Sequence, residues 1–465
     1  MAQDKATLRK YNYWQWRTLI ILMLGYALFY FVRKNFSIVM PALESELGLS
    51  KTQLGIFLTL NGVIYGVSRF FNGFLSDRLK RKRVFMAAGL FLSAVVNLVI
   101  GFLPQMNGLM GILDAEGKVT LFAVYFIGTL LLFNGVFQGM GFPPCSALLV
   151  NWVKPSELAT KQAIWNTSHS LGAGLLGLMI AGILNAFGNA AWQWCFWIPA
   201  ILAIMGAALL LLGLKDDPSD VGLPSVVTLD TATKDARDDY KESPEFKKKA
   251  YKLCVKHLVF GSPTMWCIAV CTFCVYVVRF TVLDWGSSIL TQYKGMDLGL
   301  AATVVGLTEV VGGILGVLLA GWMTDHLFKG KAHHTGLLFT AIATLFLFLF
   351  WKAPKDNTIL NIIYIVLISF FIYGPQGLVG IAASNQATKR AAASANGFVG
   401  MFGYLSPIVS GTLFGFLAQH YGWDSVFEAG IIFGIVGTIV WALIWKAPAN
   451  GYAKAEELLK QLDEE

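Results

Sequence analysis

The chain has 465 residues, of which 56% are hydrophobic and only 14% are charged, and its formal net charge is +8. A water-soluble domain of this length does not carry so large an apolar fraction, so the composition excludes a soluble enzyme or a soluble binding module. We therefore expect an all-α integral membrane protein.

About twelve stretches of the chain are long and apolar enough to cross a membrane. A hydrocarbon core of about 30 Å needs about 20 apolar residues in one helix. In chain order, we expect the spanning helices at Thr18–Leu43, Thr52–Leu75, Val84–Leu103, Leu121–Leu149, Ala163–Phe187, Trp194–Leu214, Ser262–Leu290, Leu300–Met323, Thr335–Phe350, Leu360–Ala383, Ala395–Ala418 and Val426–Trp445.

Basic residues gather in the loops that follow even-numbered helices. The densest group follows the second helix and consists of Arg78, Lys80, Arg81, Lys82 and Arg83. Short loops rich in Lys and Arg stay in the cytoplasm, so we expect both termini to be cytoplasmic. Anionic lipid headgroups account for the positive net charge, and no nucleic-acid partner is needed to explain it.

The polar stretch 215–257 divides the chain into two halves with six expected helices each. We predict an N-terminal bundle over 1–214, a cytoplasmic linker over 215–257 and a C-terminal bundle over 258–465. A repeated motif supports a duplicated architecture. Gly73 is followed by Asp77 after the second helix, and Gly321 is followed by Asp325 after the eighth, each with basic residues or histidine next to it.

Arg33 and Arg279 lie inside apolar segments and occupy matching places in the two halves. Arg33 precedes Asp77 by 44 residues and Arg279 precedes Asp325 by 46. A charge at bilayer depth costs from about 2.5 to more than 10 kcal/mol, so a tolerated arginine normally faces a cavity or a partner. Parallel repeats place substrate between the halves near the midplane, so this pair predicts an anion site there.

Six cysteines do not form a recognisable disulfide framework, and we expect them to be packing residues. Cys267, Cys271 and Cys274 share helical spacing and could ligate a metal, but no histidine or carboxylate lies among them. We expect no metal and no cofactor. The sequence holds no Walker motif, zinc-protease pair or plausible nucleophile triad, so we do not expect an enzyme.

The Gly-x-x-x-Asp motif and its basic loop resemble the major facilitator superfamily, whose fold has two pseudo-symmetric six-helix bundles. Detailed motifs resemble its organophosphate:phosphate antiporter family. They are Tyr26, Tyr30, Arg33, Lys34 and Asn35 in the first helix, Trp165, Asn166 and His169 in the fifth, Tyr276, Arg279, Asp284 and Trp285 in the seventh, and Tyr373 with Tyr404 in the tenth and eleventh.

The resemblance implies that Arg33 and Arg279 bind a phosphoryl group and that His169 assists them. A phosphomonoester carries a charge of about −1.5 to −2, and its oxygens match the fork of a guanidinium. Tyr26 and Tyr30 precede Arg33 by seven and three residues, which places their hydroxyls on nearly the same helix face. A neutral His169 bonded to a neighbouring helix is the alternative to a proton-carrying one.

Further residues are candidates for the same site or for its control. We expect Trp165, Asn166 and His169 to share one face of the fifth helix. Lys34 lies about 100° around the helix from Arg33, so direct contact with a ligand and a separate ion pair are both open. Substrate-binding candidates also include Tyr65, Arg69, Tyr276, Tyr373 and Tyr404. We expect Asp284 and Glu309 to be counter-ions of the buried cations. We expect Asp77 and Asp325 to gate the cytoplasmic side by holding neighbouring helices together in one state and releasing them in the other.

The expected function is exchange of a sugar phosphate for inorganic phosphate by alternating access in a monomer of a bacterial inner membrane. The run Gly139-Met-Gly-Phe-Pro-Pro-Cys145 is closer to the hexose-phosphate branch and favours glucose 6-phosphate. The alternatives are a sugar-phosphate receptor that signals through a membrane kinase, and a carrier of glycerol 3-phosphate or phosphoglycerate.

Overall fold

The computed structural model describes residues 5–153, 155–224 and 244–463, and it is built from helices. Up to the gap at 225–243, the elements are α1 (Lys5–Leu47), α2 (Lys51–Arg78), α3 (Lys82–Gly101), η1 (Pro104–Met106), α4 (Asn107–Met110), α5 (Leu121–Gln138), α6 (Phe142–Trp152), α7 (Pro155–Asn166), α8 (Ser168–Phe187), η2 (Asn189–Ala191), α9 (Trp194–Gly213) and η3 (Pro218–Val221).

After the gap, several helices contain short π-helical segments. The elements are α12 (Pro244–Cys254), η4 (Val255–Phe260), α13 (Pro263–Asp284), α14 (Gly286–Ser288), η5 (Ile289–Tyr293), α15 (Leu298–Val310), η6 (Val311–Gly316), α16 (Val317–His326), α17 (Ala332–Lys352), α18 (Thr358–Leu405), η7 (Ile408–Leu413), α19 (Phe414–His420), α20 (Trp423–Leu443) and α21 (Tyr452–Asp463). Within the described ranges, the β structure consists of one isolated bridge between Leu113 and Val119.

The described chain contains 12 helices that are long and apolar enough to cross a membrane, which confirms the expected number and the all-α class. The largest difference is in the first helix, which begins well before the expected Thr18. With 43 residues, α1 is about 64 Å long and extends well beyond a bilayer of about 40–45 Å. Its early part is amphipathic enough to pack on the protein, as Tyr11 shows by its burial.

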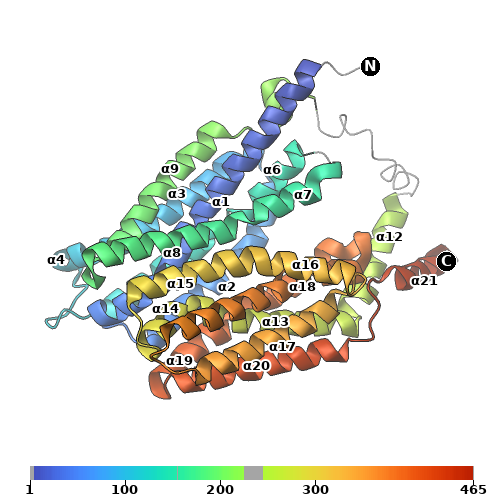
Figure 1. The fold of residues 1–465 in the computed structure, drawn as a ribbon. Coiled ribbons are helices and arrows are strands. Elements are labelled where there is room, and N and C mark those ends of the chain that lie inside the picture. The colour runs from blue at the N-terminus through green and yellow to red at the C-terminus, as the bar shows by residue number, and fades with distance from the viewer. Residues whose placement is uncertain (1–4, 154, 225–243, 464–465) are drawn as a thin grey trace. The chain divides into compact units, whose positions relative to one another are not determined.

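The structure divides into two compact units. The first contains the described parts of Met1–Gln53, Leu60–Arg237 and Leu298–Gly306, and the second those of Leu54–Thr59, Asp238–Asp297 and Leu307–Glu465. In the first unit, α1 packs against α8 and α9, and α3 packs against α5 and α9 (Figure 1). Gly172 permits the α1–α8 approach, because a Cβ there would lie 2.6 Å from the Ala27 carbonyl oxygen.

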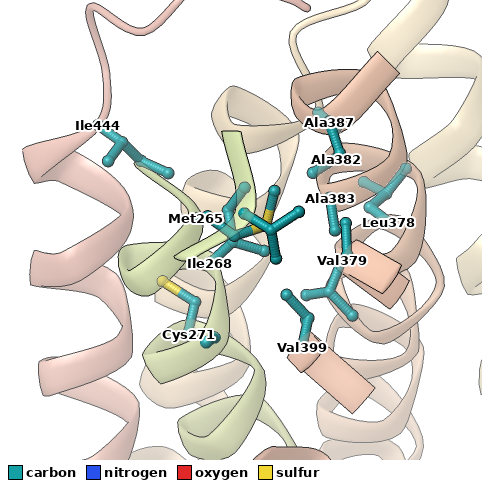
Figure 2. Packing of buried hydrophobic residues seen from close by; sticks show 14 of the residues in the cluster. Met265, Ile268, Cys271, Leu378, Val379, Ala382, Ala383, Ala387, Val399 and Ile444 are labelled. Atoms are coloured by element: carbon teal, nitrogen blue, oxygen red, sulfur yellow. The ribbon is translucent and has the colours of Figure 1, made fainter. Parts of the chain in front are cut away.

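The core of the second unit lies where α13 packs against α18. Met265 and Ile268 of α13 point toward a row of small and branched side chains on α18 that includes Val379 and Ala383 (Figure 2). The Cys271 thiol points toward α20 instead and lies 3.7 Å from the Gly437 carbonyl. All six cysteines are free thiols, and five of them are buried. Cys271 therefore acts as a packing residue, as expected for the cysteines in apolar runs.

The long helix α18 contains two membrane spans that meet at Thr388. This residue has a φ of 61°, a left-handed value that is uncommon for a residue with a Cβ. The segment after α20 contacts the bend. The Gly451 backbone amide donates to the Asn385 carbonyl at 3.0 Å, and the Gln386 side-chain amide donates to the Pro448 carbonyl at 2.6 Å. The bend therefore has a backbone partner from the C-terminal segment.

Part of the expected linker is helical. The acidic residues Asp235, Asp238 and Asp239 lie outside the described residues, but α12 follows them and leads through η4 to the seventh span. Ala250 and Cys254 are buried four residues apart, while Lys248 and Lys252 are exposed at the same spacing. This period of about four places the apolar face of α12 on the protein.

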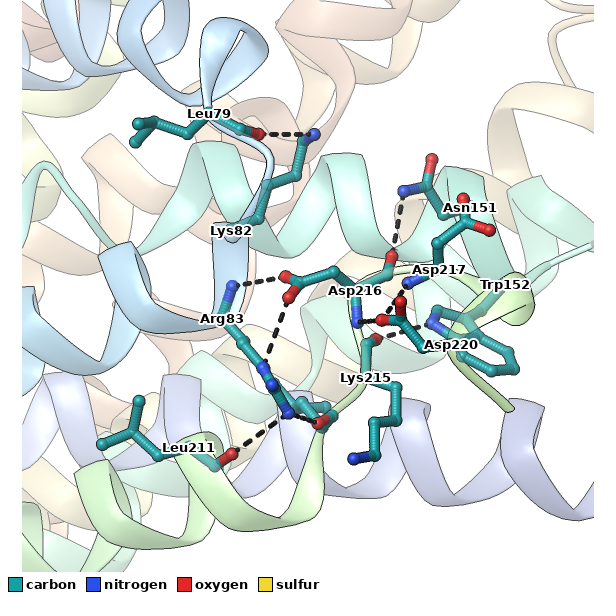
Figure 3. A network of polar contacts seen from close by, with 11 residues as sticks. Leu79, Lys82, Arg83, Asn151, Trp152, Leu211, Lys215, Asp216, Asp217 and Asp220 are labelled. Carbon is teal, nitrogen blue, oxygen red and sulfur yellow. Dashed lines mark hydrogen bonds and ion pairs between the residues drawn. The ribbon is translucent and has the colours of Figure 1, made fainter. Parts of the chain in front are cut away.

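A polar network joins the start of α3 to the segment that follows α9 (Figure 3). The Asp216 carboxylate accepts from the Arg83 backbone amide at 2.8 Å and pairs with the Arg83 Nε at 3.3 Å. The Arg83 guanidinium also donates to the Leu214 carbonyl at 2.7 Å, and Asn151 donates to the Asp216 carbonyl at 3.1 Å. Three segments of the first unit are thus joined through one buried aspartate.

Replacing Asp216 by Ala should lower the thermal stability of the purified protein. The change removes a hydrogen bond and an ion pair from a buried site, a loss of about 1–3 kcal/mol. Glu116→Ala is the matched control, since its pair with Lys118 is exposed on both sides and such pairs contribute little. Equal melting temperatures for the two variants would contradict the stabilising role of Asp216.

Candidate functional site

Arg33 lies on α1 between aromatic rings and a buried amide. Its guanidinium carbon is 4.7 Å from the centre of the Tyr30 ring and 4.0 Å from that of the Tyr65 ring. Its Nε donates to the Gln138 Oε1 at 3.0 Å. Rings from two helices thus flank the cation, in the range where cation–π attraction acts.

Aromatic side chains continue from Arg33 along α1 toward α6 and α7. Tyr26 contacts Tyr30 with ring centres 5.8 Å apart, and it contacts Trp165 at 4.9 Å. Tyr30 also contacts the His169 ring at 5.7 Å. The expected common face of Tyr26, Tyr30 and Arg33 is therefore confirmed by these contacts, and it meets the fifth span at Trp165 and His169.

The three candidates of the fifth span differ in exposure. Trp165 is fully buried, whereas the next residue, Asn166, is exposed. Successive helical residues differ by about 100°, so the two side chains leave the helix in different directions. The Asn166 backbone carbonyl contacts the His169 Nδ1, which holds the imidazole one turn from Trp165. The shared face of Trp165, Asn166 and His169 stays a prediction.

Arg69 on α2 contributes a second cation to the first unit. Its guanidinium carbon lies 3.6 Å from the centre of the Phe142 ring, and Phe142 in turn contacts Trp165 at 5.3 Å. Arg69 therefore belongs to the same aromatic cluster as Tyr26. Neither Phe142 nor Gln138 was among the residues expected from sequence, because an isolated phenylalanine or glutamine in an apolar run carries no spacing signal.

Arg279 in the second unit has a different environment, although it holds the matching place in the repeat. It is only 5% exposed, and its Nη2 donates to the Tyr373 hydroxyl at 2.9 Å. That hydroxyl donates in turn to the Glu309 carboxylate. Tyr373 thus links Arg279 to Glu309, one of the two expected counter-ions. All three residues are buried.

The other candidates differ in how far they are buried. Four of them are half-buried, and the two aspartates of the repeated motif lie near the ends of their helices. The half-buried residues are Lys34 on α1, Tyr276 and Asp284 on α13 and Tyr404 on α18; Asp325 is exposed near the end of α16, and the Asp77 side chain lies outside the described structure.

Each unit therefore buries or half-buries an arginine inside a membrane span and surrounds it with aromatic and hydroxyl groups. A guanidinium in such surroundings interacts strongly with an anion, because screening by water is weak there. Tyrosine hydroxyls add donors that suit phosphate or sugar oxygens. The chemistry that this arrangement supports is binding of a multiply charged oxyanion.

Comparison with known proteins places the chain in a family. The model of the Major Facilitator Superfamily matches residues 22–411. The chain is 34% identical to the glycerol-3-phosphate transporter of Bacillus subtilis (strain 168) over 91% of its length and 90% of that protein. It is 32% identical to the probable hexose phosphate transport protein of Chlamydia muridarum, covering 98% of this chain and 96% of that protein.

Two further similarities bear on fold and role. The chain is 34% identical to the membrane sensor protein UhpC of Salmonella typhimurium, covering 90% of this chain and 88% of that protein. A crystal structure of a D-xylose-proton symporter superposes with a TM-score of 0.71 at 14% identity, covering 93% of this chain and 98% of the other. The chain belongs to the major facilitator superfamily, within its organophosphate:phosphate antiporter-like group.

Proposed function

We propose that the protein exchanges a sugar phosphate, with glucose 6-phosphate as the organic substrate, for inorganic phosphate by alternating access. The observation that carries the proposal is the pair of arginines at matching places of the two repeats, each within a membrane span and each beside tyrosines. Relatives named for hexose phosphate and glycerol 3-phosphate support the substrate class. Arg33 and Arg279 bind the phosphoryl group.

Charge gives the reason for two arginines. A phosphomonoester with a charge of about −1.5 to −2 is offset by two guanidinium groups, and each can form paired hydrogen bonds with its oxygens. His169 assists by adding positive charge when it is protonated. The sugar is recognised by other side chains, because both arginines contact only the phosphoryl group.

Exchange follows from the same electrostatics. Without an anion, bringing the arginines into an occluded state is unfavourable, whereas either phosphate or a sugar phosphate permits it. A phosphate gradient then drives sugar-phosphate uptake without ATP. Asp77 and Asp325 gate the motion at the cytoplasmic side, both termini are cytoplasmic, and the protein acts as a monomer in a bacterial inner membrane.

Uptake into proteoliposomes tests the exchange. Vesicles loaded with phosphate should take up radiolabelled glucose 6-phosphate and release phosphate in return, while phosphate-free vesicles should take up little. Protein-free vesicles provide the background. Equally fast uptake into phosphate-free vesicles would show that exchange is not obligatory.

A second candidate role is that of a receptor, favoured by the likeness to the membrane sensor protein UhpC. A receptor would bind sugar phosphate with the same arginines and signal through a membrane kinase. Measuring binding and uptake on the same preparation separates the roles, because a receptor binds without appreciable transport. Extending the panel to glycerol 3-phosphate and phosphoglycerate ranks the alternative substrates.

A further inference from the structure

Gln138 holds Arg33 by an uncharged contact, and we infer that it is a positioning residue that orients this guanidinium without cancelling its charge. The inference rests on the proposed phosphate binding by Arg33. Gln138 is the last residue of α5 and is fully buried. It is 105 residues from Arg33 in sequence and reaches it only through the packing of α5 against α1.

The hydrogen bonds of the Gln138 amide fix which end faces Arg33. Its Nε2 donates to the Phe29 carbonyl at 3.1 Å and to the Ser93 hydroxyl at 3.3 Å. Its Oε1 accepts from the Arg33 Nε at 3.0 Å. Turning the amide over would set an NH2 group against the Arg33 N–H and a carbonyl against the Phe29 carbonyl, so only one orientation is compatible with these partners.

Two more buried amides hold the same turn of α1. Asn97 of α3 donates to the Val32 carbonyl at 2.9 Å, and Asn134 of α5 donates to that carbonyl at 3.1 Å. Asn35 donates to the Asn97 Oδ1 at 2.8 Å. All three asparagines are at most 2% exposed. Side-chain amides from α3 and α5 thus hold the Val32 carbonyl just before Arg33, and Asn97 also accepts from the Asn35 side chain just after it.

The uncharged character of these groups matters for binding an anion. An amide oxygen satisfies one of the five N–H donors of arginine and leaves the positive charge intact. A carboxylate in the place of Gln138 would form an ion pair with Arg33, and an arriving phosphate would have to compete with it. The Tyr30 and Tyr65 rings also contact the guanidinium.

The contrast with the second unit shows that this arrangement is not simply what any buried arginine requires. Arg279 is linked through the Tyr373 hydroxyl to the Glu309 carboxylate. Arg33 thus donates to an amide, whereas the hydrogen bond of Arg279 leads through a hydroxyl to a carboxylate. The Gln138 contact leaves the Arg33 charge available for a ligand. The Tyr373 hydroxyl that contacts Arg279, in contrast, also contacts the Glu309 carboxylate.

Two substitutions of Gln138 separate charge from shape. Gln138→Met removes the hydrogen bonds but leaves Arg33 charged, and it should weaken phosphate binding about tenfold, the effect of one lost hydrogen bond to a charged group. Gln138→Glu keeps the size and adds a competing carboxylate, so it should weaken binding further. Binding of radiolabelled phosphate to the purified full chain in detergent measures both.

The pH profile gives a readout that a purely structural role would not change. Protonated glutamic acid has a carbonyl acceptor and a hydroxyl donor in place of the amide, so the Gln138→Glu variant should recover affinity relative to the unsubstituted protein as pH falls. For Gln138→Met, the ratio of its phosphate affinity to that of the unsubstituted protein should not change with pH. Gln386→Glu, which adds the same charge beside Pro448 in the second unit, is the matched control and should bind normally.

Each outcome decides the question. Equal losses for Gln138→Glu and Gln138→Met, or a Gln138→Glu ratio that does not change with pH, would overturn the inference and leave the proposed function standing. Failure of the unsubstituted protein to bind phosphate or any sugar phosphate would overturn both. If Gln138→Glu does not give folded protein, a double variant decides. Gln138→Met should not weaken phosphate binding further in an Arg33→Lys background. A full additional loss of phosphate affinity would contradict positioning through Arg33.

Discussion

Arg33→Lys and Arg279→Lys should each weaken the binding of inorganic phosphate and of sugar phosphates together, by about tenfold to a hundredfold. Lysine keeps the charge but loses the planar fork that pairs with two oxygens, and each lost charge-assisted hydrogen bond is worth about 1.5–3 kcal/mol. Arg33→Lys also loses the Nε contact to Gln138, and Arg279→Lys loses the contact to Tyr373.

Competition binding with labelled phosphate against a panel of sugar phosphates measures the effect. Arg9→Lys is the matched control, since Arg9 is exposed in the early part of α1. Its affinities should equal those of the unsubstituted protein. A loss confined to sugar phosphates, with phosphate binding unchanged, would mean that the arginine contacts the organic group and would contradict its assignment to the phosphoryl group.

Gly316→Ala should strongly destabilise the second unit. A Cβ at Gly316 would lie 2.2 Å from the Phe370 carbonyl oxygen, and this atom belongs to the backbone of α18, so no side-chain movement relieves the clash. Overpacking of this kind costs about 1–3 kcal/mol or more, because the helices must move apart. We expect a low yield of monodisperse protein and a lower melting temperature.

Gly321→Ala is the control within the same membrane span. A Cβ at Gly321 would have no neighbour within 4 Å, so this variant should purify and melt like the unsubstituted protein. The comparison isolates helix contact from the general cost or benefit of replacing glycine in a helix. Similar behaviour of the two variants would show that α18 and η6 are not in close contact.

Much of the fold could be predicted from the sequence because a membrane span carries its signal locally. Twenty apolar residues in a row define a helix without reference to its neighbours, and all twelve spans were located in this way. The positions of Arg33 and Arg279 were equally visible, since a charge in an apolar run and a repeat of Gly-x-x-x-Asp are both properties of the sequence alone.

The partners of the arginines could not be predicted in the same way. Gln138 and Phe142 contact their cations only because α5 and α6 pack against α1 and α2, and packing depends on contacts between residues distant in sequence. The role of Tyr373 between Arg279 and Glu309 likewise requires three helices to meet. The helix α12 was not predicted for another reason. It has one buried apolar residue in each turn among several lysines, so its sequence resembles a polar linker.

The different partners of Arg33 and Arg279 bear on the order in which the two arginines bind an anion. Under the proposed function, an incoming phosphate would meet one arginine that donates to an amide, and another whose tyrosine partner donates to a carboxylate. We expect the anion to engage Arg33 first, and Arg279 only after the tyrosine hydroxyl has exchanged partners. The two arginines hold equivalent places in the repeat, but their different neighbours would then divide anion binding into a first step at Arg33 and a second step at Arg279.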